Sequence, residues 1–278
     1  MPGTLFIVST PIGNLGDVTH RAVEVLGTVA AVLAEDTRHS RRLLDAYGIR
    51  TPTLAHHEHN EARTTPELVA RLAAGDSLAL ITDAGTPLLS DPGARLVRAA
   101  IDAGITVSPV PGASALLAAL VAGGLDATRF TFFGFLPRKG RERAELVAEI
   151  AAARHTAVLY EAPGRVADTL GDLAAAAGGD RPAAVARELT KAFEEIRRGT
   201  LSELATYYGD NGPRGEVVLL VGGGAGAPAP DERTVHERAS ALHASGATPR
   251  DVARALAAEF GIGRNEAYRI AQAATDHA

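Results

Sequence analysis

The segment from Leu80 to Gly93, which reads LITDAGTPLLSDPG, combines residue types that suit a binding site. Its glycines, Gly85 and Gly93, can take backbone angles closed to other residues and let a ligand approach the main chain. Its two prolines stiffen the loop, so less conformational entropy is lost on binding. Asp83 and Asp91 supply acceptors that suit ribose hydroxyls or a cation better than a phosphate. An ordinary connection between a strand and a helix is the alternative, but a fixed loop of this length is more typical of a functional site.

Two further segments are expected beside this loop. STPIGN (Ser9 to Asn14) and PGASA (Pro111 to Ala115) each follow an apolar run that predicts a strand. Because the carboxyl ends of parallel strands meet at one edge of a sheet, the three segments should lie together there. Ser114 would begin the next helix, either as its cap alone or also as a ligand contact. The chain has neither GxGxxG after its first strand nor a Walker A motif, which argues against the common dinucleotide and P-loop sites.

The run HHEHNE from His56 to Glu61 contains side chains that are common zinc ligands. Adjacent residues of one loop seldom face one ion, and the sequence offers no evident further ligands. We therefore expect no metal site and interpret this run as a surface loop. A contact with a target nucleotide is the alternative.

The order of the predicted elements indicates an α/β fold with two sheets. Strand-like apolar runs alternate with helical patterns as far as residue 122, which indicates a mostly parallel sheet covered on both faces. After Gly123 and Gly124 the rhythm changes, and the strands expected over 183–188 and 193–199 are close enough to form an antiparallel hairpin. We expect an N-terminal α/β domain over 1–122 and a second α+β domain with a mixed sheet over 123–225.

The residues that follow have a different character. The segment from Gly222 to Glu232, GGGAGAPAPDE, has the composition of a flexible linker. Beyond it, residues 232–278 predict a small helical domain, in which two short amphipathic patterns separated by Gly261, Ile262 and Gly263 resemble a helix-turn-helix. These helices could contact RNA, or they could serve in domain packing or dimer formation.

The composition indicates a globular protein, because 46% of its 278 residues are hydrophobic and 22% are charged. The absence of cysteine excludes disulfides and thiolate metal sites, and it fits a reducing, cytoplasmic setting. The N-terminal run lacks the basic region of a signal peptide, and no apolar segment approaches the ~20 residues that a membrane span needs. A net charge of −5 means that a nucleic acid would need a local basic patch.

Two basic clusters could form such a patch. The first, RHSRR, contains Arg38, Arg41 and Arg42, and the second, PRKGRER, contains Arg138, Arg141 and Arg143. One cluster lies in each α/β domain, and both are candidates for contacts with RNA phosphates. A solvated helix face or loop is the alternative for each.

Seven motifs in a fixed order carry a resemblance to a known family. They are TPIGN, AEDTRHS, DAGTPLLSDPG, PGASA, GFLPRKG, LYEAPGR and ARELTKAFEE, spread over residues 9 to 195. In these motifs the chain resembles the ribosomal RNA ribose 2′-O-methyltransferase branch of the tetrapyrrole methylase family. Its helical C-terminal residues are similar to the extra domain of that branch.

The resemblance implies a cofactor, a substrate and an assembly. The cofactor is S-adenosylmethionine, bound between the two α/β domains, and the substrate is a cytidine ribose in the decoding region of 16S ribosomal RNA within the 30S subunit. The assembly is a homodimer. By the resemblance, cofactor contacts fall to Pro11, Ala84, Gly85, Thr86, Asp91, Ser114, Ala115, Leu136, Tyr160, Ala186 and Arg187. For Tyr160, a place at the edge of the core is the alternative.

The implied reaction also needs a base, because a neutral ribose hydroxyl is a poor nucleophile. The candidates are Lys139, Asp36 and Glu188, with Glu161 beside Arg165 as a further one. Lys139 would have to lose its proton, which requires burial or neighbouring positive charge. Glu161 and Glu188 could instead pair with nearby Arg, and the loop around Lys139 could bind phosphate without taking part in the chemistry.

Two other functions stay open. A C-methyltransferase acting on a tetrapyrrole would share the fold of the wider family, but the basic clusters and the helical C-terminal residues favour RNA. A non-catalytic RNA-binding protein with this fold is disfavoured by the intact loop from Asp83 to Gly93.

Overall fold

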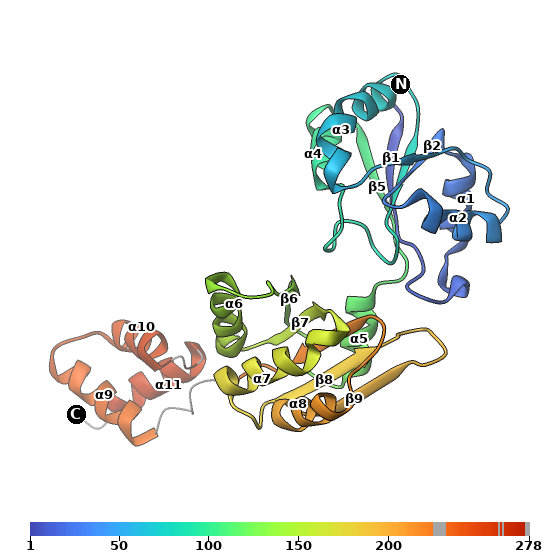
Figure 1. Cartoon of the computed structure of the whole chain (residues 1–278). Coiled ribbons are helices and arrows are strands. Elements are labelled where there is room, and N and C mark those ends of the chain that lie inside the picture. Colours follow the sequence, from blue (N-terminus) through green and yellow to red (C-terminus); the bar gives the residue numbers. More distant parts are fainter. Residues whose placement is uncertain (225–231, 261, 263, 276–278) are drawn as a thin grey trace. The chain divides into compact units, whose positions relative to one another are not determined.

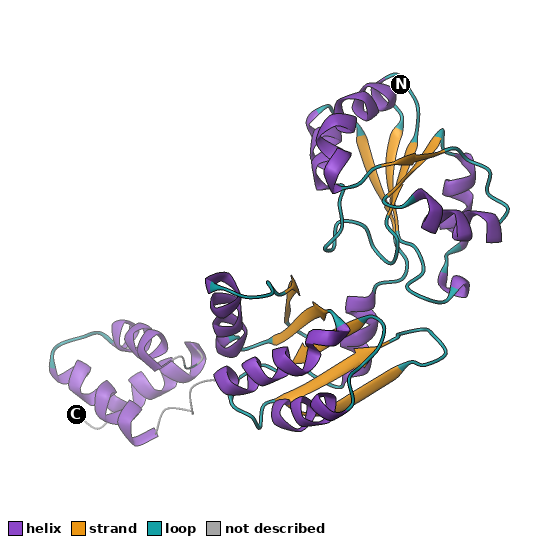
Figure 2. Ribbon diagram, viewed as in Figure 1, coloured by secondary structure: helices purple, strands orange, loops and turns teal. Residues whose placement is uncertain are grey.

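The computed structural model describes residues 1–224, 232–260, 262 and 264–275 (Figure 1). The chain divides into two units, Met1–Gly224 and Ala225–Ala278. The first unit contains one parallel and one mixed five-stranded sheet, which confirms the predicted α/β class (Figure 2). Residues 225–231 of the expected linker, and Gly261 and Gly263 of the expected turn, lie outside the described residues.

The N-terminal sheet is parallel throughout, in the order β3-β2-β4-β1-β5. Its strands are β1 (Thr4–Val8), β2 (Ala31–Ala34), β3 (Thr53–Ala55), β4 (Leu78–Ile81) and β5 (Thr106–Val110). The elements between them are the one-turn segment η1 (Leu15–Asp17), α1 (His20–Thr28), α2 (Thr37–Ala46), α3 (Glu58–Ala73) and α4 (Ala94–Asp102). Because β1 lies between β4 and β5, the loops that follow these three strands meet at one edge of the sheet.

Helices cover both faces of this sheet, because successive side chains of a strand point to opposite sides. Leu33 and Leu80 belong to a buried cluster that includes side chains of α3 and α4. Val32 and Ile81, one residue away in each strand, belong to another cluster with side chains of α1 and α2. Figure 1 shows these two helix pairs on opposite sides of the strands. The continuous apolar runs of β2 and β4 follow from this double burial.

The second sheet is mixed, in the order β6-β7-β10-β8-β9. Its strands are β6 (Phe130–Phe135), β7 (Thr156–Glu161), β8 (Pro182–Arg187), β9 (Glu195–Thr200) and β10 (Val217–Val221). Strands β6 and β7 are parallel, β10 is antiparallel to both of its neighbours, and β8 and β9 form the antiparallel pair that the sequence predicts. The other elements are α5 (Ala115–Gly123), α6 (Arg141–Ala152), the one-turn segment η2 (Pro163–Arg165), α7 (Val166–Ala177) and α8 (Leu201–Asp210).

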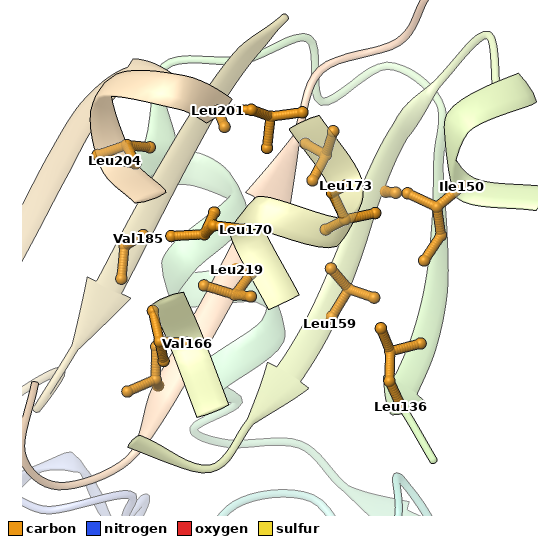
Figure 3. Close-up of a cluster of buried hydrophobic side chains, with 14 of the residues drawn as sticks. Leu136, Ile150, Leu159, Val166, Leu170, Leu173, Val185, Leu201, Leu204 and Leu219 are labelled. Carbon is orange, nitrogen blue, oxygen red and sulfur yellow. The ribbon is translucent and has the colours of Figure 1, made fainter. Parts of the chain in front are cut away.

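The second sheet is also covered on both faces. Side chains of α6, α7 and α8 share a buried cluster with Leu159 and Leu219 of the sheet (Figure 3). On the other face, Leu116 of α5 packs with Val158 and Val218. Helix α5 therefore packs on the second sheet, although it lies mostly before residue 123. The domain limits expected from the sequence stay predictions.

The expectation of a surface loop at residues 56–61 needs correction. His56 is only 1% exposed, and α3 already begins at Glu58. Nδ1 of His56 lies 3.0 Å from Oγ1 of Thr64, and burial lowers the pKa of His56. The amide of Asn60 accepts from the backbone of His57 and so caps the helix. Polar capping residues carry no apolar periodicity, which is why the sequence pattern indicates a loop where the helix begins.

The second unit contains α9 (Glu232–Ala244), α10 (Pro249–Phe260) and α11 (Arg264–Thr275). These helices have a core of their own, which includes Val235, Val252 and Leu256. In the part of the chain that the structure describes, no helix combines the length and the apolar character needed to cross a bilayer.

Candidate active site

The segments that follow β1, β4 and β5 are bonded to one another. Thr10 and Gly85 exchange two backbone hydrogen bonds, with N–O distances of 2.8 and 3.1 Å. The hydroxyl of Thr86 lies 2.9 Å from that of Ser9 and donates to the carbonyl of Ala113. These bonds hold the three segments together at the edge of the sheet, as the sequence predicts.

The loop between β4 and α4 has an unusual backbone. Gly85, Leu88, Ser90 and Gly93 all have positive φ, with values of 83°, 75°, 72° and 119°. For Leu88 and Ser90 this conformation costs of order 1–3 kcal/mol each. At Gly93 a Cβ would also lie 2.5 Å from Cδ2 of Leu80, so a larger residue there would be strained and would have to displace the Leu80 side chain. Such strain persists where the surrounding structure fixes it, and it is concentrated at binding sites.

A pocket of about 450 Å³ opens beside this loop. Residues of both sheets line it: Ile12 and Ala84 come from loops of the first sheet, while Tyr160 and Val218 come from strands of the second. Its volume falls in the range of roughly 300–1,000 Å³ that is usual for small-molecule sites. We call it the acidic pocket, because its charged lining residues are carboxylates.

All charged side chains that line this pocket, among the described residues, are carboxylates: Glu35, Asp83, Asp91, Glu161 and Glu216. Two of them are paired, because Glu161 binds Arg165 and Glu216 binds Lys191. The other three have no ion pair within the described ranges. The acidic pocket thus collects negative charge without a cation of its own.

Two of the three unpaired carboxylates accept from neutral donors instead. The hydroxyl of Thr82 donates to Glu35 at 3.0 Å, and the backbone N–H of Asp36 donates to Asp83 at 3.2 Å. Burial, followed by the charges of Glu35 and Asp83, raises the pKa of Asp91 to about 6. A cationic ligand would relieve this repulsion and would favour the charged form of Asp91.

These carboxylates are not arranged as a metal site. Across residues 1–224 and the described residues of the second unit, no group of three or more Asp, Glu or His is placed to hold a metal ion. The arrangement suits a larger organic cation, whose positive groups can reach separate carboxylates.

More than half of the predicted cofactor contacts come together here. The acidic pocket is lined by Ala84, Gly85, Thr86, Asp91, Ala115 and Tyr160. The ring of Tyr160 is half-buried and packs edge-on against Phe132, with ring centroids 4.9 Å apart. Burial raises the pKa of Tyr160, so its hydroxyl stays neutral over the physiological range.

The remaining predicted contacts lie elsewhere. Pro11 lines a neighbouring pocket. Leu136 and Ala186 are buried in the hydrophobic clusters, and Arg187 donates to Glu195 at 2.6 Å. None of these four is among the lining residues of the acidic pocket.

Ser114 stands at the N-terminus of α5 but does not cap it through its side chain. The residue is 9% exposed, and its hydroxyl has no hydrogen-bond partner among the described atoms. A buried hydroxyl without a partner costs roughly 1–3 kcal/mol. Ser114 therefore has a donor and an acceptor to offer a ligand beside Ala115.

Sequence reasoning missed several residues of the acidic pocket, above all Glu35, Phe135 and Glu216. Glu35 directly follows β2, so the rule about strand ends could have found it. Phe135 ends an edge strand, and Glu216 precedes the central antiparallel strand of the second sheet. No local pattern assigns either place, because both depend on the pairing of distant strands.

Two of the predicted bases have structural partners and do not line the acidic pocket. Asp36 accepts from the backbone N–H of Arg38 at 2.8 Å and so caps α2; hydrogen bonds from Arg38 lower its pKa. Glu188 accepts from Lys191 at 2.9 Å, and this bond lowers the pKa of Glu188. A carboxylate with a lowered pKa is a weak base.

The third predicted base, Lys139, is exposed in a loop that two arginines anchor. Arg165 donates to the carbonyl of Leu136 at 2.7 Å, and Arg143 donates to the carbonyl of Pro137 at 3.1 Å. Because Arg165 also donates to Glu161 at 2.6 Å, the Lys139 loop is tied to a wall of the acidic pocket.

One of the expected RNA contacts differs in the structure. The side chain of Arg143 is only 12% exposed and binds Asp172 at 2.7 Å, so it serves the internal network rather than the solvent face. The other expected contacts, Arg38, Arg41, Arg42, Arg138 and Arg141, are exposed. Their exposure leaves them able to contact a polyanion.

Comparison with known proteins agrees with this architecture. Residues 4–205 match the family model described as Tetrapyrrole (Corrin/Porphyrin) Methylases. Among solved structures, a cobalt precorrin-4 methyltransferase is similar with a TM-score of 0.59 and 20% identity, over 79% of this chain and 94% of that one. A diphthine synthase is similar with a TM-score of 0.60 and 14% identity, over 79% and 89%. These likenesses concern the fold.

Curated relatives are much closer in sequence. A protein of Synechocystis sp. named ribosomal RNA small subunit methyltransferase I is 46% identical over 270 residues, 96% of this chain and 97% of that protein. A protein of the same name from Pseudomonas aeruginosa is 48% identical over 273 residues, 97% of this chain and 96% of that protein. The chain therefore belongs to the tetrapyrrole methylase family, in the group of the ribosomal RNA small subunit methyltransferase I proteins.

Proposed function

We propose that this protein is an S-adenosylmethionine-dependent methyltransferase that modifies the ribose 2′-hydroxyl of a cytidine in 16S ribosomal RNA. The names of relatives that span nearly the whole chain support the RNA substrate. The observation that carries the enzymatic part is the acidic pocket, which brings three unpaired carboxylates beside a strained, glycine-containing loop.

The residues of this pocket fit the cofactor. S-adenosylmethionine carries its transferable methyl group on a sulfonium cation and has a second positive charge on its amino group. Glu35, Asp83 and Asp91 would hold these positive groups. Gly85 and Ala115 lack bulky side chains and leave the main chain open to the ligand. Ser114 would offer its unpaired hydroxyl.

The reaction forms a bond between the ribose oxygen and the methyl carbon as the carbon–sulfur bond breaks, and the hydroxyl proton passes to a base. Lys139 stays our candidate for that base, because its loop is tied to the pocket wall and it has no ion pair in the described structure. A positioned base contributes ~10²- to 10⁴-fold to such a transfer.

The test is methyl transfer from labelled S-adenosylmethionine to small ribosomal subunits that lack the modification. We expect label in the RNA, at one dinucleotide that resists alkaline hydrolysis, because a 2′-O-methyl group blocks cleavage there. A porphyrinoid precursor in a parallel reaction tests the alternative C-methyltransferase activity. Transfer to the porphyrinoid and not to the RNA would refute the proposal.

Three further points concern the form of the substrate, the location of the protein and its assembly. We propose that the assembled 30S subunit is the substrate, that the protein works in the cytoplasm and that it forms a homodimer. Comparing free 16S RNA with assembled subunits tests the first part. Light scattering on the purified protein tests the last, and a monomeric mass would contradict it.

A further inference from the structure

A second pocket, of about 270 Å³, adjoins the acidic pocket. The two pockets share four lining residues, Ile12, Asp83, Ala84 and Glu216. The second pocket extends from these residues to α2 and to Lys191. Because these four residues line both pockets, the two pockets are adjacent.

The second pocket contains basic side chains in addition to the shared carboxylates Asp83 and Glu216. Its lining includes His39, Arg42 and Lys191, whereas the described lining of the acidic pocket contains no basic side chain. Arg42 is exposed, and no ion pair or hydrogen bond of its guanidinium is described. A cation in this state suits a phosphodiester, which is the one charged group of a ribonucleotide chain.

The interior of the second pocket is partly apolar and contains an unsatisfied hydroxyl. Leu43 and Ile81 are buried and line it, which suits the faces of a base or a ribose. Ser40 also lines it, is 3% exposed, and its Oγ has no partner among the described atoms. A buried hydroxyl in this state costs roughly 1–3 kcal/mol, and a bond to a ligand recovers that energy.

The position of Lys191 depends on a neighbouring glycine. A Cβ at Gly13 would lie 2.5 Å from Cγ of Lys191 and 2.9 Å from its Cε. The lysine therefore lies across the loop that follows β1, and its ammonium group binds Glu188 and Glu216, each at 2.9 Å. Lys191 lies between β8 and β9 of the second sheet and thus forms one side of the second pocket.

We propose that the second pocket holds the nucleotide that is methylated. Its apolar wall receives the base or ribose, the hydroxyl of Ser40 bonds to the nucleoside, and Arg42 binds an adjoining phosphate. The shared wall then presents the ribose to the contents of the acidic pocket. This inference rests on the proposed function, since it assigns the subsite for that RNA substrate.

The experiment compares Arg42→Gln and Ser40→Ala with a matched control, Arg50→Gln. Arg50 is also an exposed arginine and lies between α2 and β3. It binds Asp45 and is not among the lining residues of either pocket. Single-turnover methyl transfer is measured against the concentration of unmodified small subunits, at several salt concentrations. Calorimetry with S-adenosylmethionine alone gives the cofactor affinity of each protein.

For Arg42→Gln we expect a five- to twentyfold higher half-saturating subunit concentration and unchanged cofactor affinity. The slope of log affinity against log salt should fall by ~0.7, the value for one phosphate contact on a single strand. For Ser40→Ala we expect weaker subunit binding together with unchanged or higher thermal stability, because the lost hydroxyl is unpaired in the free protein. Arg50→Gln should match the wild type in all three measurements.

Two results overturn the inference, and they are distinguishable. If the wild type transfers methyl groups to RNA while Arg42→Gln and Ser40→Ala keep its half-saturation and salt slope, the target nucleotide binds elsewhere and the proposed function stands. If the wild type transfers nothing to RNA, the proposed function fails and the subsite fails with it.

Discussion

The carboxylate of Glu161 is fully buried and binds the guanidinium of Arg165. The same carboxylate accepts from the backbone N–H of Ala162 at 2.8 Å and from the hydroxyl of Thr169 at 2.7 Å. Arg165 in turn holds the carbonyl of Leu136. One buried ion pair therefore connects a wall of the acidic pocket to the loop that carries Lys139.

Replacing Glu161 by Gln should lower the free energy of unfolding by ~3 kcal/mol, since it leaves the partly buried Arg165 without its counter-charge. Urea denaturation measures this change. The control is Arg98→Gln, which removes an exposed pair with Asp102 and should change stability by ~0.5 kcal/mol or less. A Glu161→Gln protein as stable as the wild type would contradict the structural role of the pair.

The raised pKa of Asp91 predicts how cofactor affinity depends on pH. Asp91 should be charged above about pH 6 and neutral below it. Because a neutral carboxyl attracts a cation less, affinity for S-adenosylmethionine should fall as the pH drops from 7 to 5. Calorimetry at a series of pH values measures this, and an affinity that is flat over this range would exclude Asp91 from cofactor binding.

Stability should change with pH in the opposite direction. The pKa of Asp91 is about 6 in the folded protein and 3.8 in the unfolded chain, so between these values the folded state binds more protons. The contribution of Asp91 to stability without ligand therefore falls as the pH rises from 4 to 6. Asp91→Asn should abolish this dependence, raise stability at pH 7 and weaken cofactor binding ~10-fold, or ~1.4 kcal/mol.

Thr86→Val tests the junction of the three loops. The change keeps the shape of the side chain but removes its bonds to Ser9 and Ala113, so it should lower stability by ~1 kcal/mol and weaken cofactor binding several-fold. Thr206→Val is a matched control, because this exposed threonine bonds only to the carbonyl of Ser202 of its own helix in the described structure. Equal cofactor affinities for the two variants would show that Thr86 has no special role.

Lys139→Ala should lower the single-turnover rate of methyl transfer ~100-fold while leaving cofactor affinity unchanged. Lys139→Arg separates the two roles considered for this residue. An arginine keeps the positive charge but does not release a proton, so it rescues phosphate binding and not catalysis. A wild-type rate for Lys139→Arg would assign Lys139 to RNA binding.

Removal of residues 232–278 should weaken binding of small subunits at least 10-fold. The described helices of this region have their own core, so the sheets of the first unit should keep their fold and their affinity for S-adenosylmethionine. Filter binding of subunits and calorimetry with the cofactor measure the two effects. A truncated protein that binds and methylates subunits normally would assign these helices a role other than RNA contact.

The first sheet could be predicted well from the sequence. Apolar runs such as Leu78 to Ile81 are buried on both faces, and the glycines and prolines that follow mark the ends of the strands. The gathering of the Thr10, Gly85 and Ala113 loops followed from parallel topology alone. Local pattern and global arrangement agree here, because all strands of a parallel sheet have their carboxyl ends at the same edge.

The second half of the site could not be predicted in this way. Lys191 and Glu216 are 25 residues apart, and only the insertion of β10 between β7 and β8 brings them together. For Glu188 the sequence offers pairing with an arginine as the alternative, whereas the structure pairs it with Lys191. The capping role of Asp36 leaves no mark on composition. Both residues are candidate bases by sequence, and in the structure their hydrogen bonds weaken them in that role.

The central place of β10 has a consequence for synthesis of the chain. The parallel sheet uses residues 4–110 and can be completed early on the ribosome, whereas β10 comprises Val217–Val221 and yet joins β7 to β8. Until residue 221 has left the exit tunnel, β7 and β8 each lack a neighbour on one side. The nascent protein thus carries an open edge on β7 after Glu161 and a second one on β8 after Arg187, until Val221 is available, and this interval is when a chaperone would protect it best.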